Sequence, residues 1–243
     1  MRKNPMLAIF TTVFIDLLGF GILIPVFPLL ITDGPFRVTP DGWSFTQGMI
    51  MLGWLQAIYP FCMFIAAPIL GQLSDRHGRR PVLALSIFGT AIGYVLFAIG
   101  ISTGNLPLLF AARGLDGMTG GNLAVAQAAI GDISTHENRA KNFGYMGAAF
   151  GMGFIVGPYL GGKLSSPSVS FYGLFDTPHW FGATTPFWFA AILALLNCTA
   201  VLTTFPETIK EKFHGGKIRV GQSLNNVVNG FKSDRLRVIL LSS

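Results

Sequence analysis

The chain has 243 residues, of which 51% are hydrophobic and only 12% are charged, whereas an ordinary soluble domain has about 25% charged residues. This composition, with a mean hydropathy of +0.56, excludes a soluble globular protein and indicates a polytopic membrane protein. The net charge of +6 does not indicate a nucleic-acid partner, because the basic residues lie in short segments beside apolar runs. We attribute that charge to the cationic loops that membrane proteins keep on the cytoplasmic side.

Six apolar runs are each about 20 residues long, the length of helix that crosses a hydrocarbon core of about 30 Å. We therefore predict an all-α membrane protein with six transmembrane helices. Residues 1–205 would form this bundle, and residues 206–243 a cytoplasmic linker that could include the start of a seventh helix. The expected spans are approximately 7–30, 46–70, 82–101, 107–130, 143–162 and 185–205.

The positions of the basic residues predict the orientation in the membrane. A cytoplasmic N-terminus places fourteen of the seventeen Lys and Arg residues on the cytoplasmic side. Arg37 and Lys163 then lie outside, and Arg113 lies within a span. We expect a multi-pass protein of the cell inner (plasma) membrane, with both ends of the six-span unit in the cytoplasm.

A charged turn, GQLSDRHGRRP, separates the second and third expected spans. Its glycines allow positive φ and close backbone approach, and its final Pro suits the first turn of a helix. The turn resembles the signature loop of the major facilitator superfamily, G-x-L-x-D-R-x-G-R-R/K, which lies between that family's second and third helices. A generic cationic anchor would explain the arginines but not the ordered Gly and Asp positions. The resemblance implies a cytoplasmic gate loop made by Gly71, Asp75, Arg76, Gly78, Arg79 and Arg80.

The first expected span carries one carboxylate, Asp16, about ten residues in and therefore about 14 Å deep. An ionised carboxylate at that depth must face a cavity, pair with a cation or be protonated for much of the time. Asp16 is thus a candidate proton site; the alternative is a structural Asp that ties two helices together. The pattern D-x-x-G-x-G-x-x-x-P-V-x-P that begins there resembles the first helix of the tetracycline/proton antiporters and the twelve-span drug antiporters.

The fourth expected span places Arg113 and Asp116 three residues apart, and so near each other on a helix. A cation inside a membrane needs a counter-ion, which Asp116 or Asp16 could supply. Gln127, fourteen residues from Arg113 and on nearly the same helical face, is a candidate for a neutral hydrogen bond in the cavity. The run resembles the family's fourth-helix motif R-x-x-x-G-x-x-G, whose Arg is implicated in proton coupling.

Asp116 stands at a position where that motif often has Gln. Three alternatives remain open: Asp16 or Asp116 is the principal proton carrier, or the two titrate as a coupled pair. A locked structural pair between Arg113 and Asp116 is the competing interpretation.

The fifth expected span has glycines four residues apart, a spacing that makes grooves for close helix packing, and a Pro that removes one backbone hydrogen bond. Its end resembles the motif G-x-x-x-G-P-x-x-G-G, which distinguishes exporters from importers within the superfamily. The residues that fill this motif are Gly153, Gly157, Pro158, Gly161 and Gly162.

The sequence has no motif for nucleotide hydrolysis or metal-dependent catalysis. Cys62 and Cys198 fall within apolar runs without metal-ligand spacing, and G-x-x-x-x-G-K-S/T, H-E-x-x-H and G-x-S-x-G runs are absent. We therefore expect no cofactor, no metal and no enzymatic activity.

The resemblance implies the N-terminal half of a major facilitator fold, whose members usually join two six-helix halves by a cytoplasmic linker. It further implies a proton-coupled exporter (antiporter) of drugs such as tetracycline or other small molecules, working by alternating access. The expected partners are a small-molecule substrate, protons, the lipid bilayer and the missing C-terminal six-helix half. The alternatives are a sugar or metabolite transporter, a transport-inactive half that serves as a binding or assembly module, and a six-span protein that dimerises.

Overall fold

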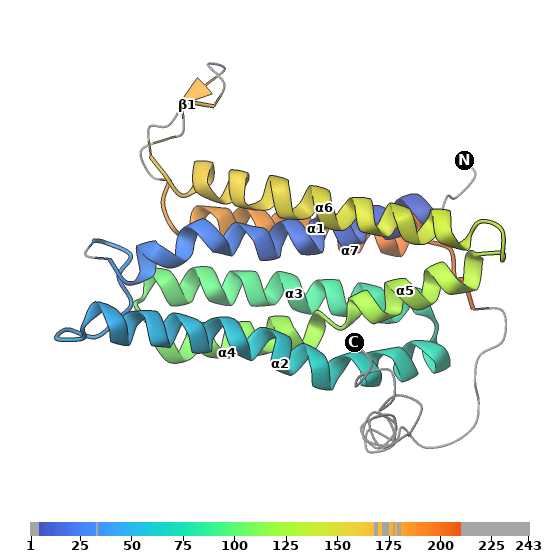
Figure 1. The fold of residues 1–243 in the computed structure, drawn as a ribbon, viewed down its shortest axis with the longest axis horizontal. Coiled ribbons are helices and arrows are strands. Elements are labelled where there is room, and N and C mark those ends of the chain that lie inside the picture. The colour runs from blue at the N-terminus through green and yellow to red at the C-terminus, as the bar shows by residue number, and fades with distance from the viewer. Residues whose placement is uncertain are drawn as a thin grey trace, which may run out of the picture. The chain divides into compact units, whose positions relative to one another are not determined.

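The computed structural model describes residues 5–32, 34–167, 170–171, 175–176, 178 and 181–209. The described helices lie in one compact unit, Met1–Lys212, and form a bundle (Figure 1). The predicted linker lies almost entirely outside the described residues and stays a prediction. The elements are α1 (Pro5–Val26), the 3-10 helix η1 (Phe27–Leu30), α2 (Phe45–His77), α3 (Arg79–Ser102), α4 (Leu106–Thr119), α5 (Asn122–Ile133), α6 (Arg139–Leu164), the paired strands β1 (Ser170–Phe171) and β2 (Phe175–Asp176), and α7 (Thr185–Thr204).

Helix packing divides the bundle into two groups joined by α3. Helix α1 packs against α6 and α7, α2 packs against α4 and α5, and α3 contacts both α4 and α7 (Figure 1). Five helical segments among the described residues are long and apolar enough to cross a membrane. They correspond to five of the six expected spans, and the all-α prediction is confirmed apart from the two short strands.

The fourth expected span is divided. Helices α4 and α5 have 14 and 12 residues, and they follow one another along the bundle (Figure 1). The break falls at Gly120 and Gly121, which weaken a helix because glycine gains backbone freedom on unfolding. Both glycines also lie against α2, where a Cβ on Gly120 would come within 2.7 Å of the Tyr59 hydroxyl oxygen. Close contact with α2 therefore keeps this irregular stretch covered by protein.

The charged turn is shorter than its sequence indicates. Helix α2 begins at a capping box between Ser44 and Gln47 and continues for 33 residues to His77. Only Gly78, with a φ of +109°, separates it from α3. The expected special backbone is thus found at Gly78, whereas Gly71 is helical with open space around its Cα.

The glycines of α6 bring its backbone against α1. A Cβ on Gly153 would lie 2.7 Å from Leu17 Cβ, and one on Gly157 would lie 2.7 Å from the carbonyl oxygen of Leu18. Gly161 makes a similar approach to Ile22. The predicted close packing is confirmed for these three glycines, whereas a Cβ on Gly151, on the same helix, would have no described atom within 4 Å.

A methyl group at Gly157 should separate α1 from α6, because the atoms it would meet are backbone atoms that cannot rotate away. We expect Gly157→Ala to lower the free energy of unfolding by about 1–3 kcal/mol, measured as a lower thermal midpoint of the purified protein in detergent. Gly151→Ala is the matched control and should leave the midpoint unchanged or slightly higher. Equal effects of the two substitutions would contradict the close α1–α6 contact.

Candidate functional site

The centre of the bundle holds a buried ion pair within α4. Arg113 Nη1 lies 2.9 Å from Asp116 Oδ2, and the two side chains are 1% and 7% exposed. The second terminal nitrogen of Arg113 donates to Gln56 Oε1 of α2 at 3.1 Å. The guanidinium also lies 4.6 Å from the ring centroid of Tyr59. Asp116 is therefore the counter-ion of Arg113, and α2 supplies both its neutral and its aromatic partners.

Helix α3 completes the surroundings of Asp116. Gly93 lies so close that a Cβ there would be 3.2 Å from Asp116 Cβ. The hydroxyl groups of Thr90 of α3 and Thr119 of α4 lie 3.0 Å apart. Arg113 Nε is buried without a hydrogen-bond partner among the described residues. The pair is thus held by three helices but not fully satisfied.

Asp16 has a different environment from Asp116. It is partly buried on α1, and its Oδ1 accepts a hydrogen bond of 3.0 Å from Nδ2 of Asn122. Within the described part of the chain, the recorded ion pairs do not include Asp16. Asp116 is therefore paired with a cation, whereas Asp16 has a neutral amide as its partner.

Gln127 lies on α5 and is exposed, and its side chain has no recorded hydrogen bond to the described residues. The expectation that it shares a face with Arg113 assumed one continuous helix, which the break at Gly120 and Gly121 interrupts. Its role in the cavity stays a prediction.

The G-x-x-x-G-P-x-x-G-G run of α6 lies against the helix that carries Asp16. Gly153 contacts α1 at Leu17 and Leu18, the residues that directly follow Asp16. Pro158 Cδ would be 2.8 Å from a Cβ on Gly21, and Gly162 lies farther along, near Pro25. The motif residues therefore fix the distance between α6 and the Asp16 helix.

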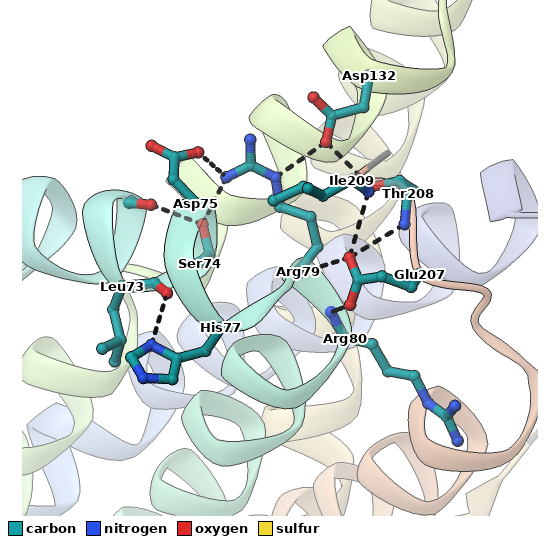
Figure 2. Close-up of polar contacts among 11 residues, drawn as sticks. Leu73, Ser74, Asp75, His77, Arg79, Arg80, Asp132, Glu207, Thr208 and Ile209 are labelled. Carbon is teal, nitrogen blue, oxygen red and sulfur yellow. Dashed lines mark hydrogen bonds and ion pairs between the residues drawn. The ribbon is translucent and has the colours of Figure 1, made fainter. Parts of the chain in front are cut away.

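A second polar cluster surrounds Arg79, the first residue of α3 (Figure 2). Arg79 is buried, and its guanidinium lies 2.7 Å from Asp75 Oδ1 and 2.9 Å from Asp132 Oδ2. It also donates to the hydroxyl group of Ser74. Asp132 belongs to the last turn of α5, so Arg79 joins the α2–α3 connection to the C-terminal end of α5.

Glu207 caps the N-terminus of α3. Its carboxylate accepts hydrogen bonds from the backbone N–H groups of Arg79 at 2.8 Å and Arg80 at 3.3 Å, where a helix favours negative charge. Thr208 donates from its hydroxyl group to Asp132 at 3.0 Å. A side chain at Gly78 would collide with the Glu207 carboxylate. The segment after α7 is therefore tied to the same cluster.

Of the six residues predicted for the gate loop, Asp75 and Arg79 form an ion pair (Figure 2). Gly78 lies directly before Arg79, at the N-cap of α3. Arg80 contributes its backbone N–H, while its side chain points away from the Arg79 cluster (Figure 2). Sequence reasoning missed Asp132 and Glu207, although each is an acidic residue at the end of an apolar run. It also missed Ser74, Gln56 and Asn122, which are neutral polar residues with no distinctive spacing.

A family model described as Major Facilitator Superfamily matches residues 9–242. The chain is 41% identical over 167 residues to the class C tetracycline resistance protein of Escherichia coli, covering 69% of this chain and 39% of that protein. It is 33% identical over 232 residues to the class H tetracycline resistance protein of Pasteurella multocida, covering 95% and 52%. The chain thus spans about half the length of these relatives or less.

Two solved structures share the fold. The human organic anion transporter TETRAN is 23% identical with a TM-score of 0.66, over 88% of this chain and 50% of that chain. The xylose transporter XylE of E. coli, in a partially occluded inward-open conformation, is 19% identical with a TM-score of 0.63, over 84% and 51%. At these identities the likeness extends to the fold alone.

Replacement of Glu207 by Gln should loosen the N-terminus of α3, because the amide has no negative charge to place on the helix end. We expect a local loss of about 1 kcal/mol, which corresponds to about fivefold faster hydrogen exchange at the Arg79 and Arg80 amides. Hydrogen–deuterium exchange with mass spectrometry measures this change. Glu137→Gln, in the exposed α5–α6 connection, is the control; unchanged exchange in Glu207→Gln would contradict the capping role.

Proposed function

Because this chain belongs to the major facilitator superfamily, we propose that it forms part of a proton-coupled secondary exporter. The proposed cargo is tetracycline or another small-molecule drug, moved against protons by alternating access. The class C and class H relatives, whose names refer to tetracycline resistance, support this cargo. The exporter-type motif packed against the Asp16 helix supports the direction of transport.

The observation that carries the proposal is the uncharged hydrogen-bond partner of Asp16. A carboxylate within a membrane span needs compensation for its charge, and here its recorded partner is the uncharged amide of Asn122. A proton or a cationic group of a substrate can supply that compensation in turn. If the two compete for one carboxylate, binding of one favours release of the other, which couples their opposite movements.

The Arg113–Asp116 pair has a supporting part in this mechanism. The charge of Arg113 is matched by Asp116, so Asp16 has its own, uncharged partner. Asp116 also acts electrostatically on Asp16. A change in the protonation of either carboxylate would therefore be felt by the other.

The Arg79 cluster is proposed as the latch of the cytoplasmic side. It joins the ends of α2, α3 and α5 to the residues that follow α7 through side chains and a capped helix end. Such a cluster favours one of two alternative arrangements of a transporter. We also propose that the N-terminus lies in the cytoplasm, that the protein lies in the cell inner membrane, and that a C-terminal six-helix half completes the cavity.

Two alternatives remain, because the fold does not specify the cargo. The first is a sugar or metabolite transporter, and a xylose transporter shares the fold. The second is a membrane binding or assembly module without transport activity. To separate these functions, the full reading frame is determined first, and proton movement in proteoliposomes is then assayed with tetracycline and with xylose. Proton movement with tetracycline favours the exporter, and proton movement with xylose alone favours the sugar transporter. Binding without proton movement favours the module.

Asp16→Asn should abolish tetracycline-driven proton movement, because the amide remains neutral and cannot take up a proton. We expect the signal from a pH-sensitive dye in proteoliposomes to fall to that of empty liposomes. Asp41→Asn, which changes an exposed carboxylate in the α1–α2 connection, should retain the signal. Proton movement that persists in Asp16→Asn would move the proton site to another carboxylate, with Asp116 the next to test.

A further inference from the structure

Asn122 is the hydrogen-bond partner of Asp16, and only one of the two polar atoms of its side chain has a partner among the described residues. The residue is 2% exposed, and its Nδ2 donates to Asp16 Oδ1 at 3.0 Å. Its Oδ1 is buried and has no hydrogen-bond partner among the described residues. A buried amide oxygen without a partner is unusual and calls for an explanation.

The position of Asn122 is set by the break in the fourth expected span. It is the first residue of α5 and follows Gly121 directly. Gly121 is pressed against α2, where a Cβ would lie 3.1 Å from Ala67 Cα. The contact with α2 therefore fixes the start of α5, and the amide of Asn122 is held beside Asp16.

The two halves of the amide match the two protonation states of Asp16. An ionised carboxylate only accepts hydrogen bonds, which fits the donor Nδ2. A protonated carboxyl group also carries an O–H that needs an acceptor, and the unpartnered Oδ1 belongs to the same side chain. Rotation about the Cβ–Cγ bond of Asn122 would bring Oδ1 to the place of Nδ2 without any movement of the backbone.

We propose that Asn122 is a positioning residue that holds the Asp16 carboxyl group by a hydrogen bond in both its ionised and its protonated state. The amide donates to the carboxylate, and after proton uptake it accepts from the new O–H. The proton resides on Asp16 throughout, and Asn122 neither gains nor loses one. The part of this inference that concerns transport rests on the proposed function.

Other groups near Asp16 do not supply this pairing. Asp116 of α4 is the ionisable side chain of a neighbouring helix that acts electrostatically on Asp16. Tyr59 of α2 packs against Phe20 and Tyr94 of α3 lies against Gly19, so both phenols lie beside the Asp16 helix. Helix α6 carries charge only toward its ends, at Arg139, Lys141 and Lys163, and α7 has no charged residue. Among the described contacts of Asp16, the amide of Asn122 is the one recorded hydrogen bond.

The chain offers a matched control for a purely structural role. Asn197 of α7 is also buried, at 4% exposed, and its Oδ1 accepts a hydrogen bond of 3.3 Å from Thr12 Oγ1, one turn before Asp16 on α1. This bond ties two helices together without a titratable partner. Removing the amide at position 197 therefore tests helix tethering alone.

The direct test is infrared difference spectroscopy of the complete protein between alkaline and acidic pH. The carbonyl stretching band of protonated Asp16 is identified by its loss in Asp16→Asn. We expect Asn122→Leu, which keeps the volume and removes the hydrogen bond, to move this band to higher frequency, and Asn197→Leu to leave it in place. If Asn122→Leu does not fold, Asn122→Ala is measured in the same way. A band that stays in place in the Asn122 variant, or that is absent from the wild-type protein, overturns the inference.

The transport assay adds an independent measure. Loss of one hydrogen bond to a charged group should lower tetracycline-driven proton movement about tenfold in Asn122→Leu, against less than about twofold in Asn197→Leu. Equal losses would assign Asn122 a tethering role and overturn the inference. If the wild-type protein moves no protons with tetracycline while the infrared band still shifts in Asn122→Leu, the proposed function fails and the positioning role stands.

Discussion

A charge within a membrane span needs a partner in the protein or a water-filled cavity. Arg113 meets this requirement through Asp116, Gln56 and the ring of Tyr59. These contacts bring α2 and α4 together at the point where the fourth expected span breaks. Since the charge of Arg113 is paired with Asp116, Asp16 is left with a neutral partner, and the chemistry proposed for the chain follows from that difference.

Close backbone contact is the second condition for this arrangement. Gly117, Gly120 and Gly121 allow α2 to approach α4 and α5, while Gly153 and Gly157 allow α6 to approach α1. Without a hydrophobic driving force between helices in a membrane, such contacts contribute through van der Waals packing. The glycines therefore hold the carboxylate-bearing helices at distances that short polar side chains such as Asn122 can bridge.

Much of the fold could be predicted from apolar run length, since five of the six runs of about 20 residues each correspond to one helical segment of the described chain. The Arg113–Asp116 pair was predictable because i,i+3 residues are neighbours on a helix. The break at Gly120 was not, because the apolar pattern continues through it and only contact with Tyr59 favours the interruption. The Asn122–Asp16 and Arg79–Glu207 contacts join residues 106 and 128 positions apart; they depend on how helices pack, which local spacing does not encode.

The division of the fourth expected span into α4 and α5 also bears on how the chain enters the membrane. Neither helix is long enough to cross alone, and α4 carries Arg113 and Asp116, each of which costs about 2.5–3.5 kcal/mol at the centre of an isolated inserting helix. Helices α2 and α3 precede this segment in the chain and supply the surfaces that cover its polar groups. During synthesis, α4 and α5 therefore depend on the helices that were inserted before them. A defect in α2 would first be detected as failed membrane insertion of α4 and α5.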